Sequence, residues 1–362
     1  MLAWTIDEWP LREQPDELLA ELYAVRGELH AEATLDDPRM SLAGEIASAR
    51  YQPACEDGVV LAARDPGGAI RGYASCRWLY LPGWDHVLQI HIAVLPGARR
   101  QGLGRLLLNR AKAVAECRGL RLVTGWTKDN VTAGAAFCAA MQAEKAMVAE
   151  ENRLDLHSVD RALVGRWLAD APRRAPGYRL KFVAGPTPPE LADEAAAVLN
   201  VMNTAPRERL DVGDTRFTPE LLSQYDEAAS AAGAQRRAYY AVEEKSGRFV
   251  GLSDITVRPE LPDRVSVGDT AVDPAHRGQG LGKWLKAAIT RHILDDLPNV
   301  RWVITSNAGS NAPMLAINHE LGFQSVSVDT TWQLAVEALQ VAAGGRAGSS
   351  ASSEGLERGR AN

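Results

Sequence analysis

Cysteine is scarce in this chain and occurs in no metal-binding or redox pattern. The 362 residues include 4 cysteines, and no two of them form a Cys-x-x-Cys pair. None lies beside a histidine at the spacing of a zinc site. We therefore expect no metal centre, and we expect small free thiols in a reducing compartment, which predicts a cytoplasmic protein. The four are Cys55, Cys76, Cys117 and Cys138.

An excess of positive charge is also absent. Lysine and arginine number 40 against 46 aspartate and glutamate residues, which gives a formal net charge of −6. Proteins that bind duplex nucleic acid usually present a basic surface. The charge balance therefore argues against nucleic acid as the main partner, although it leaves tRNA binding open. It is compatible with a cationic amine as substrate.

Long apolar runs are missing as well. No run approaches the ~20 residues that cross a bilayer, and the first ten residues contain Asp7 and Glu8 instead of a basic and apolar secretion signal. We expect no membrane partner. The remaining composition, 46% hydrophobic and 24% charged, is that of an ordinary globular protein. The length suffices for two domains with separate cores.

The most informative feature is a short glycine-rich segment that occurs twice. It reads Arg99-Arg100-Gln101-Gly102-Leu103-Gly104 in the first half and Arg277-Gly278-Gln279-Gly280-Leu281-Gly282 in the second. Each copy follows an apolar run ending in Val-x-Pro and leads into a helix-like stretch, at 105–117 and 283–294. A strand, a glycine turn and a helix hold phosphate well, because unpaired N–H groups of the helix N-terminus point at the anion. Two copies predict two similar domains, each built around a phosphorylated cofactor.

This repeated turn resembles motif A of the GCN5-related N-acetyltransferase (GNAT) family, an Arg/Gln-x-x-Gly-x-Gly/Ala turn after a Val-ended strand. Its spacing differs from the dinucleotide fingerprint and from the P-loop. In that family the turn holds the pyrophosphate of acetyl-CoA, and two domains in one chain are a known arrangement. The resemblance implies an α/β protein of two tandem GNAT-fold domains. Each domain would have a mixed, mostly antiparallel central sheet flanked by helices, and the protein would be an acyltransferase.

The repeat also suggests how the chain is divided. At an offset of 178 residues His91 aligns with Asp269, and the glycines of the two turns align with each other. We expect a first domain at 1–157, a linker at 158–177, a second domain at 178–342 and a disordered tail at 343–362. The last strands of the two domains are predicted around 153–156 and 330–334.

The resemblance assigns the donor site of the second domain residue by residue. Backbone groups of Val272 are expected to hydrogen-bond the pantetheine arm, and its N–H to stabilise the oxyanion. The N–H groups of the turn are expected to hold the pyrophosphate. Asn311, which precedes a later helix, is either a donor contact or a plain N-cap. The residues of the turn are Arg277, Gly278, Gln279, Gly280, Leu281, Gly282 and Lys283.

The first domain repeats most of this pattern but departs from it at two places. Arg100 stands where the second copy has Gly278, and Met141-Gln142-Ala143 replaces the family's closing Leu321-Gly322-Phe323. Donor binding there remains expected, and the alternative is a domain that kept the fold and lost the chemistry. The second domain is therefore the better catalytic candidate. The expected donor-binding residues of the first domain are Val94, Arg99, Arg100, Gln101, Gly102, Leu103 and Gly104.

Catalysis of acetyl transfer needs a base and a proton donor for the leaving thiolate. Asp269 is the nearest carboxylate before the second turn and is the candidate base, with Asp254 as a substitute and a solvated carboxylate as the alternative. The family's usual acid is a tyrosine at the position of Asn318, and asparagine cannot replace it. His319 is adjacent, but a neighbouring residue on a helix points about 100° away. The acid is thus unassigned.

Three functions fit these observations. The leading one is an acetyl-CoA-dependent N-acetyltransferase that transfers directly to the amine of a small molecule, such as an antibiotic or a thiol-precursor sugar. The second is an acyl- or aminoacyl-transferase on the same fold, including one that takes aminoacyl-tRNA. The third is a non-catalytic protein that binds acetyl-CoA. The acidic stretch 208–214 could attract a cationic amine or could be a solvated loop, and the tandem layout favours a monomer.

Overall fold

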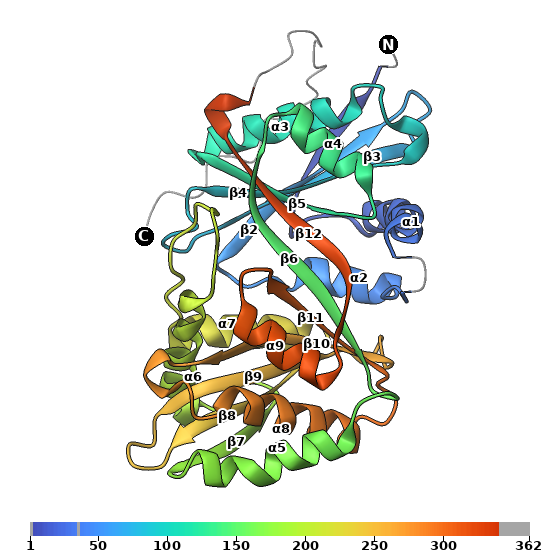
Figure 1. Cartoon of the computed structure of the whole chain (residues 1–362). Helices are drawn as coiled ribbons and strands as arrows, with labels where there is room; N and C mark the ends of the chain where they lie inside the picture. Colours follow the sequence, from blue (N-terminus) through green and yellow to red (C-terminus); the bar gives the residue numbers. More distant parts are fainter. Residues whose placement is uncertain (1–2, 35–36, 340–362) are drawn as a thin grey trace.

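One continuous sheet organises the molecule in the computed structural model, which describes residues 3–34 and 37–339. The tail expected at 343–362 lies outside these residues. Figure 1 shows the sheet running through both halves of the chain. In spatial order its strands are β1 (Thr5–Pro10), β2 (Glu56–Arg64), β3 (Ile70–Leu79), β4 (Val87–Val94), β5 (Leu122–Lys128), β12 (Gln324–Ala335), β6 (Glu144–Asp155), β11 (Trp302–Ala308), β10 (Arg264–Val272), β9 (Phe249–Val257), β8 (Gln235–Glu243) and β7 (Tyr178–Ala184).

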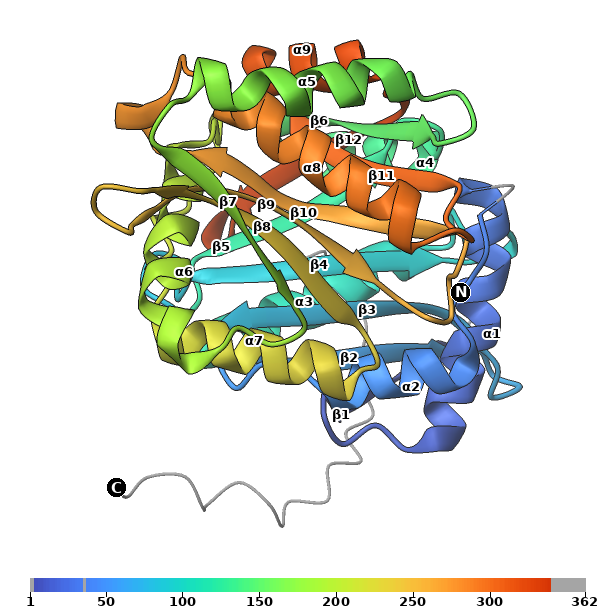
Figure 2. The ribbon, with the colours of Figure 1, turned by 90° about the horizontal axis from the view of Figure 1, so that it is seen from below.

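Helices cover both faces of this sheet, as Figure 2 shows from a second direction. Neighbouring strands are antiparallel except in two pairs, β4 with β5 and β10 with β11. The predicted fold class, a mixed and mostly antiparallel sheet flanked by helices in two similar halves, is confirmed. The helices are α1 (Asp16–Ala33), α2 (Leu42–Arg50), α3 (Leu103–Arg118), α4 (Thr132–Ala140), α5 (Arg161–Arg174), α6 (Ala192–Leu199), α7 (Pro219–Ala231), α8 (Leu281–Asp296) and α9 (Ala312–Leu321).

The two halves exchange their last strands. Strand β6 comes from the first half of the chain but pairs with β11 and β12, whereas β12 comes from the second half and pairs with β5 and β6. Figure 1 shows these two long strands crossing between the halves. Helix α5, which follows β6, packs on α8 of the second half. Each half of the sheet is therefore completed by a strand from the other half.

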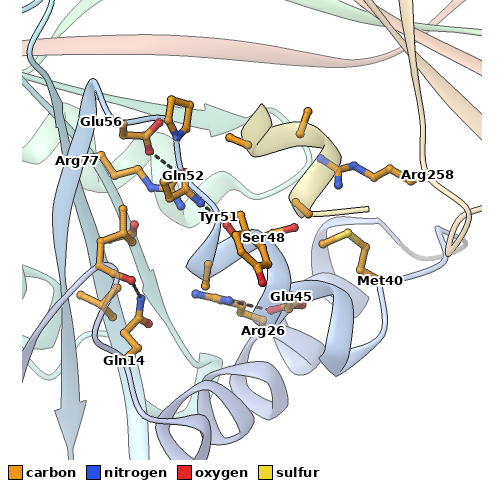
Figure 3. A pocket seen from close by; sticks show the side chains of 18 of the residues that line it. Gln14, Arg26, Met40, Glu45, Ser48, Tyr51, Gln52, Glu56, Arg77 and Arg258 are labelled. Carbon is orange, nitrogen blue, oxygen red and sulfur yellow. Dashed lines mark hydrogen bonds and ion pairs between the residues drawn. The ribbon is translucent and has the colours of Figure 1, made fainter. Parts of the chain in front are cut away.

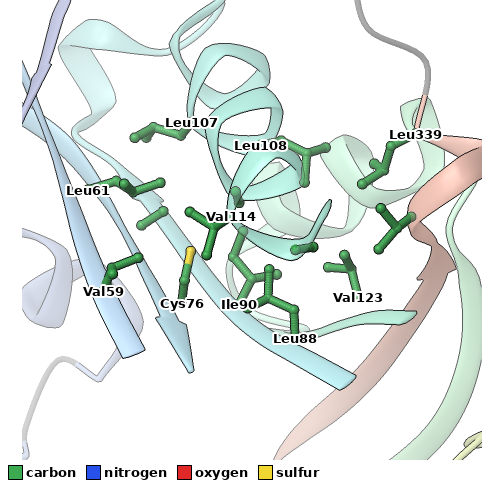
Figure 4. Packing of buried hydrophobic residues seen from close by; sticks show 14 of the residues in the cluster. Val59, Leu61, Cys76, Leu88, Ile90, Leu107, Leu108, Val114, Val123 and Leu339 are labelled. Atoms are coloured by element: carbon green, nitrogen blue, oxygen red, sulfur yellow. The ribbon is translucent and has the colours of Figure 1, made fainter. Parts of the chain in front are cut away.

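Alternation along the strands divides the core into layers. In β2, Val59, Leu61 and Ala63 face α3, while Val60 and Ala62 pack against α1 on the opposite face. Figure 4 shows the α3 side, where Leu107 and Val114 of the helix lie over apolar side chains of the strands. This packing holds the strand, turn and helix of the first glycine motif in a fixed geometry, and α8 packs on β8, β9 and β10 in the same way.

An acidic residue in the loop between α1 and α2 links the two halves. Asp37 accepts two hydrogen bonds from Arg153 on β6, both at 2.7 Å, and a third at 2.8 Å from Arg264 on β10. The three side chains are largely buried, with exposed fractions of 13%, 22% and 10%. The two arginines hold the pKa of Asp37 below its usual value against the opposing effect of burial.

We expect Asp37→Ala to lower the free energy of unfolding by about 1–3 kcal/mol, because it leaves two half-buried guanidinium groups without their acceptor. Urea unfolding followed by circular dichroism measures the change. Asp295→Ala is the matched control, since its ion pair with Arg291 is exposed at 54% and 46% and is expected to contribute under about 0.5 kcal/mol. Equal effects for the two variants would contradict a structural role for Asp37.

Candidate active site

Strands β10 and β11 separate halfway along their length. They pair only over Arg264–Ser266 and Trp302–Ile304, whereas β10 stays paired with β9 as far as Val272. The first half repeats this feature, because β4 and β5 pair only over Val87–Gln89 and Leu122–Thr124. Beyond these points, β4 and β10 present backbone N–H and C=O groups along one edge. Such an edge can take an extended ligand in the manner of an added strand.

The turn after β10 concentrates free backbone donors. The first helical hydrogen bond of α8 runs from the N–H of Trp284 to the carbonyl of Gly280. None of the amide groups from Gly278 to Lys283 donates to an acceptor within residues 3–34 and 37–339. Gly278 and Gly280 have φ values of +81° and +82°, which glycine adopts at little cost. Together with the helix dipole, these donors make a site for an anion.

The first half contains the same turn despite its substituted glycine. Arg100 adopts φ +63° and Gly102 φ +84°, and the first helical bond of α3 joins the N–H of Leu106 to the carbonyl of Gly102. A left-handed conformation costs a residue with a side chain roughly 1 kcal/mol. Arg100 therefore accepts strain that a glycine would avoid, and the backbone geometry is retained.

The leading arginine of each turn ties the turn to its strand. The Nε atom of Arg277 donates to the carbonyl of Val272 at 2.9 Å, and its Nη2 atom donates to Thr204 at 2.7 Å. Arg99 donates in the same way to the carbonyl of Val94 at 3.0 Å and forms an ion pair with Glu32. These side chains set the angle between strand and helix, a role that the motif alone did not predict.

Other polar side chains of the second turn are also engaged. Gln279 donates to the hydroxyl of Tyr178 at 3.2 Å, and that hydroxyl lies 2.8 Å from Nδ1 of His276. Lys283 forms an ion pair with Glu320 of α9. The turn is thus braced by side chains on its outer side, while its amide groups remain available.

A β-bulge in β10 places Asp269. The pairing of β10 with β9 shifts between Val267 and Thr270, and the carboxylate of Asp254 accepts the N–H of Asp269 at 2.8 Å. Gly268 is required beside it, because a Cβ there would lie 2.3 Å from Oδ1 of Asp254. The Nε atom of Arg236 in turn donates to Asp254 at 2.6 Å. A glycine within a strand pattern is a bulge signal, so this feature was open to sequence reasoning that missed it.

Asp269 has the properties of a base near neutral pH. Burial raises the pKa of its carboxyl group to about 6, the charge of Asp254 adds to the rise, and Arg236 opposes it. No described residue donates a hydrogen bond to this carboxylate, so it is free to accept a proton. The first half has His91 at the aligned position, on a strand without a bulge. Burial there lowers the pKa of His91, and its ring stacks on Trp126 at 5.3 Å.

The remaining predicted residues lie on or beside α9. Asn318 is fully buried and donates from Nδ2 to Oδ1 of Asn307 at 2.7 Å, while its own Oδ1 has no partner in the described chain. His319 is exposed and points away from the core. Asn311 occupies the N-cap position of α9 without a side-chain cap hydrogen bond. None of these three has a hydrogen bond with Asp269 in the described chain.

The acidic stretch 208–214 makes contacts between the halves. Glu208, at φ +50°, accepts from the N–H of Val148 on β6 and from the hydroxyl of Ser310, both at 3.2 Å. Asp214 pairs with Arg207 at 3.0 Å. Two of the carboxylates expected to attract an amine are therefore already engaged within the protein.

A cavity of about 720 Å³ lies away from Asp269, between α1, α2 and the strands β2 and β3, with α7 along one side. Figure 3 shows its charged lining. Two of its arginines are paired with glutamates at 2.7 Å, Arg26 with Glu45 and Arg77 with Glu56. None of the residues around Asp269 belongs to its lining.

Two separated strand pairs, each followed by a glycine turn that leads into a helix, define a tandem α/β protein with a duplicated strand, turn and helix arrangement. The chain belongs to the acetyltransferase (GNAT) family, whose model matches residues 22–140 and again residues 204–323. The resemblance found in the repeated motif is thereby confirmed, and the protein is an acyltransferase. No helix in residues 3–34 or 37–339 is long and apolar enough to cross a bilayer.

Two curated relatives match parts of this chain. Mycothiol acetyltransferase of Saccharomonospora viridis is 35% identical over 100 residues, which are 26% of this chain and 32% of that protein, so the match spans about a third of that relative. Mycothiol acetyltransferase of Thermobifida fusca is 28% identical over 247 residues, 64% of this chain and 70% of that protein.

Two solved structures extend this likeness over nearly the whole chain. A tandem GNAT protein from the clavulanic acid biosynthesis pathway superimposes with a TM-score of 0.72 at 25% identity, covering 91% of this chain and 98% of that one. A GCN5-related N-acetyltransferase from Sphaerobacter thermophilus gives 0.62 at 16% identity, over 91% and 96% of the two chains, and shows the fold alone.

Proposed function

We propose that the protein is an acetyl-CoA-dependent N-acetyltransferase that acts on the amino group of a small molecule, and that its second half is catalytic. The observation that carries this proposal is Asp269. Its carboxylate accepts no hydrogen bond from the described residues and has a pKa raised to about 6. It lies on the part of β10 whose edge faces away from β9 and is unpaired with β11. A general base works best when its pKa lies near the working pH.

The second glycine turn and the open edge of β10 fit acetyl-CoA, the proposed acyl donor. The amide groups from Gly278 to Lys283 supply donors for a pyrophosphate, and the open edge of β10 up to Val272 supplies groups for an amide-containing arm. The first half offers an equivalent turn and edge. It has a histidine whose pKa is lowered in place of the carboxylate. We infer that the first half binds donor without transferring its acetyl group.

We propose that the acetyl group is transferred directly to the acceptor. The ammonium group of the acceptor first loses one proton to solvent. The neutral nitrogen then attacks the carbonyl carbon of the thioester, and Asp269 takes the second proton as the N–C bond forms. Backbone N–H groups of the open strand, with that of Val272 as the candidate, stabilise the negative oxygen. The C–S bond then breaks as the amide forms. Acetyl-CoA supplies the activated acyl group.

The acceptor is proposed as a small amine. The two curated relatives are named mycothiol acetyltransferases, and the tandem structural neighbour comes from an antibiotic-related pathway. These names make a thiol-precursor sugar with a free amino group the first acceptor to test. A thiol-containing acceptor needs an assay that does not depend on free sulfhydryl detection.

The test has two stages. Acetyl-CoA is titrated calorimetrically into the purified full-length protein, and a panel of amines is then screened by mass spectrometry for an added acetyl group. We expect binding at micromolar donor and acetylation of at least one small amine. A wild-type protein that shows no heat of binding would contradict the donor assignment and would direct the search to aminoacyl-tRNA. Tight binding with no acetylation of a broad panel would favour a donor-binding protein without catalysis.

A further inference from the structure

A lysine is buried at the interface between α8 and α9 of the second half. Lys286 is 2% exposed. A Cβ at Gly282 would lie 3.3 Å from Ile317 of α9, so this side of α8 faces α9. Lys286 follows one helical turn later on the same side. Its Nζ atom lies 5.6 Å from the ring centre of Phe323, directly after α9.

Lys286 lies level with Asp269 along the sheet. Strand β10 enters the turn and α8 runs back over the sheet, since Leu281 packs near Val272 while Ile293 packs near Val265. Three strand residues from Asp269 to Val272 span about 10 Å. Six helical residues from Gly280 to Lys286 span about 9 Å. Lys286 therefore lies at about the same level as Asp269 along β10.

The positions of the first half that correspond to Lys286 and Asn318 carry neither a lysine nor an asparagine. Leu108 follows Gly102 by six residues, as Lys286 follows Gly280, and it is a core residue. Cys138 stands in α4 where Asn318 stands in α9, each seven residues after its N-cap. The half with the free carboxylate thus also has the buried lysine, and the half with His91 has neither.

We propose that Lys286 donates the proton to the sulfur that leaves when the acetyl group is transferred. This inference rests on the proposed function. Asp269 takes the proton lost by the amine as the N–C bond forms, and the C–S bond breaks with its electron pair on sulfur. The Lys286 ammonium group then protonates that sulfur. Asp269 releases its proton to solvent and Lys286 regains one, so that amine and acetyl-CoA give amide and CoA.

The surroundings of Lys286 support such a role. Burial lowers its pKa to about 8, and the charge of Asp254 on β9 opposes this effect. Asp254 is itself shared with Arg236 on β8 and with the backbone of Asp269 on β10. From α9, Glu320 is paired with Lys283 and His319 is exposed. A buried ammonium group with a lowered pKa gives up its proton more readily than a surface lysine.

Lys286→Met, which keeps an unbranched side chain of similar size and removes the ammonium group, tests this role. We expect kcat to fall about 100-fold, the affinity for acetyl-CoA to stay within about threefold, and the alkaline limb of the pH profile near 8 to disappear. Lys286→Arg keeps the charge but holds its proton too strongly to donate it, and we expect a similar loss of kcat. Leu108→Met is the matched control in the first half and should leave kcat unchanged.

A second readout does not depend on turnover. The ammonium group should favour the thiolate of bound CoA, so the thiol of CoA bound to the wild-type protein should titrate at least one pH unit lower than that of CoA bound to Lys286→Met. Ultraviolet absorbance of the thiolate measures this, and desulfo-CoA gives the baseline. A merely structural lysine would leave the thiol unchanged, and its arginine variant would keep full activity.

The outcomes separate this inference from the function on which it rests. Wild-type kcat with the alkaline limb retained in Lys286→Met would overturn the role of Lys286 and leave the proposed function intact. Failure of the wild-type protein to bind acetyl-CoA would instead overturn the proposed function. Thermal melts establish that each variant is folded, and removal of a buried charge by methionine should leave the melting temperature equal or higher.

Discussion

Gly280→Trp is expected to abolish binding of acetyl-CoA to the second half and, with it, acetyl transfer. Gly280 ends the turn at φ +82°, directly before the free amide groups of α8. An indole at this position occupies the space over those amide groups and favours a different backbone conformation. Loss of two charge-assisted hydrogen bonds alone weakens binding by about 100-fold or more. Isothermal titration calorimetry and a turnover assay measure both effects.

Gly102→Trp is a control variant that should introduce a similar backbone strain in the first half. Gly102 has φ +84° and nothing within 4 Å of an added Cβ, so the strain on folding is comparable to that at Gly280. We expect this variant to lose one donor-binding event while kcat stays near the wild-type value. If Gly102→Trp abolished turnover and Gly280→Trp left it intact, catalysis would belong to the first half and the proposal would be wrong on this point.

The repeated motif predicted the two glycine turns because the geometry of each turn is decided locally. Glycine at 278, 280 and 102 favours the left-handed backbone that each turn uses, and the apolar spacing after each turn is that of a helix packed on one face. The predicted helices 105–117 and 283–294 correspond to α3 at Leu103–Arg118 and α8 at Leu281–Asp296. Only the ends differ, by a few residues.

The exchange of β6 and β12 could not be predicted in this way. The predicted strand at 153–156 overlaps the end of β6, and that at 330–334 lies within β12. The choice of a neighbouring strand, however, depends on contacts far apart in the sequence. Either strand satisfies its own backbone equally well in its own half or in the other. The arginine at 153 contributes to the exchanged arrangement through Asp37, and neither residue has a local signal for that contact.

In the candidate site, too, the residues fixed by local sequence were predicted and those that depend on distant contacts were not. Asp269 was predicted as the nearest carboxylate before the second turn, and its position relative to that turn is decided locally. The ion pair of Arg236 with Asp254 is not local, because it joins two strands across the sheet. Lys286 was missed for a different reason: a lysine on an amphipathic helix is normally assigned to the solvent face, and only the folded structure shows that it is buried.

Asp269→Asn is expected to lower kcat by about 10²–10⁴-fold, the usual contribution of a positioned general base. The affinity for acetyl-CoA should not change, because the groups proposed to bind it are backbone amides and not the carboxylate of Asp269. In the wild-type protein, activity should rise with pH through about 6, where the carboxylate loses its proton. The variant should lack this acidic limb, and a pH series of kcat/KM measures it. His91→Asn is the matched control in the first half and should keep the wild-type profile.

The same substitution should make the protein more stable, and this separates a base from a structural carboxylate. The pKa of Asp269 is raised from 3.8 to about 6, so between these values the folded state holds the proton more tightly than the unfolded state. Stability therefore falls as pH rises through that window, by up to about 3 kcal/mol for a shift of two units. Asparagine carries no charge, so Asp269→Asn should unfold at a higher urea concentration than the wild type at pH 7, and the difference should shrink towards pH 4. A variant that is inactive and also less stable at pH 7 would show that the carboxylate supports the bulge and does not serve as the base.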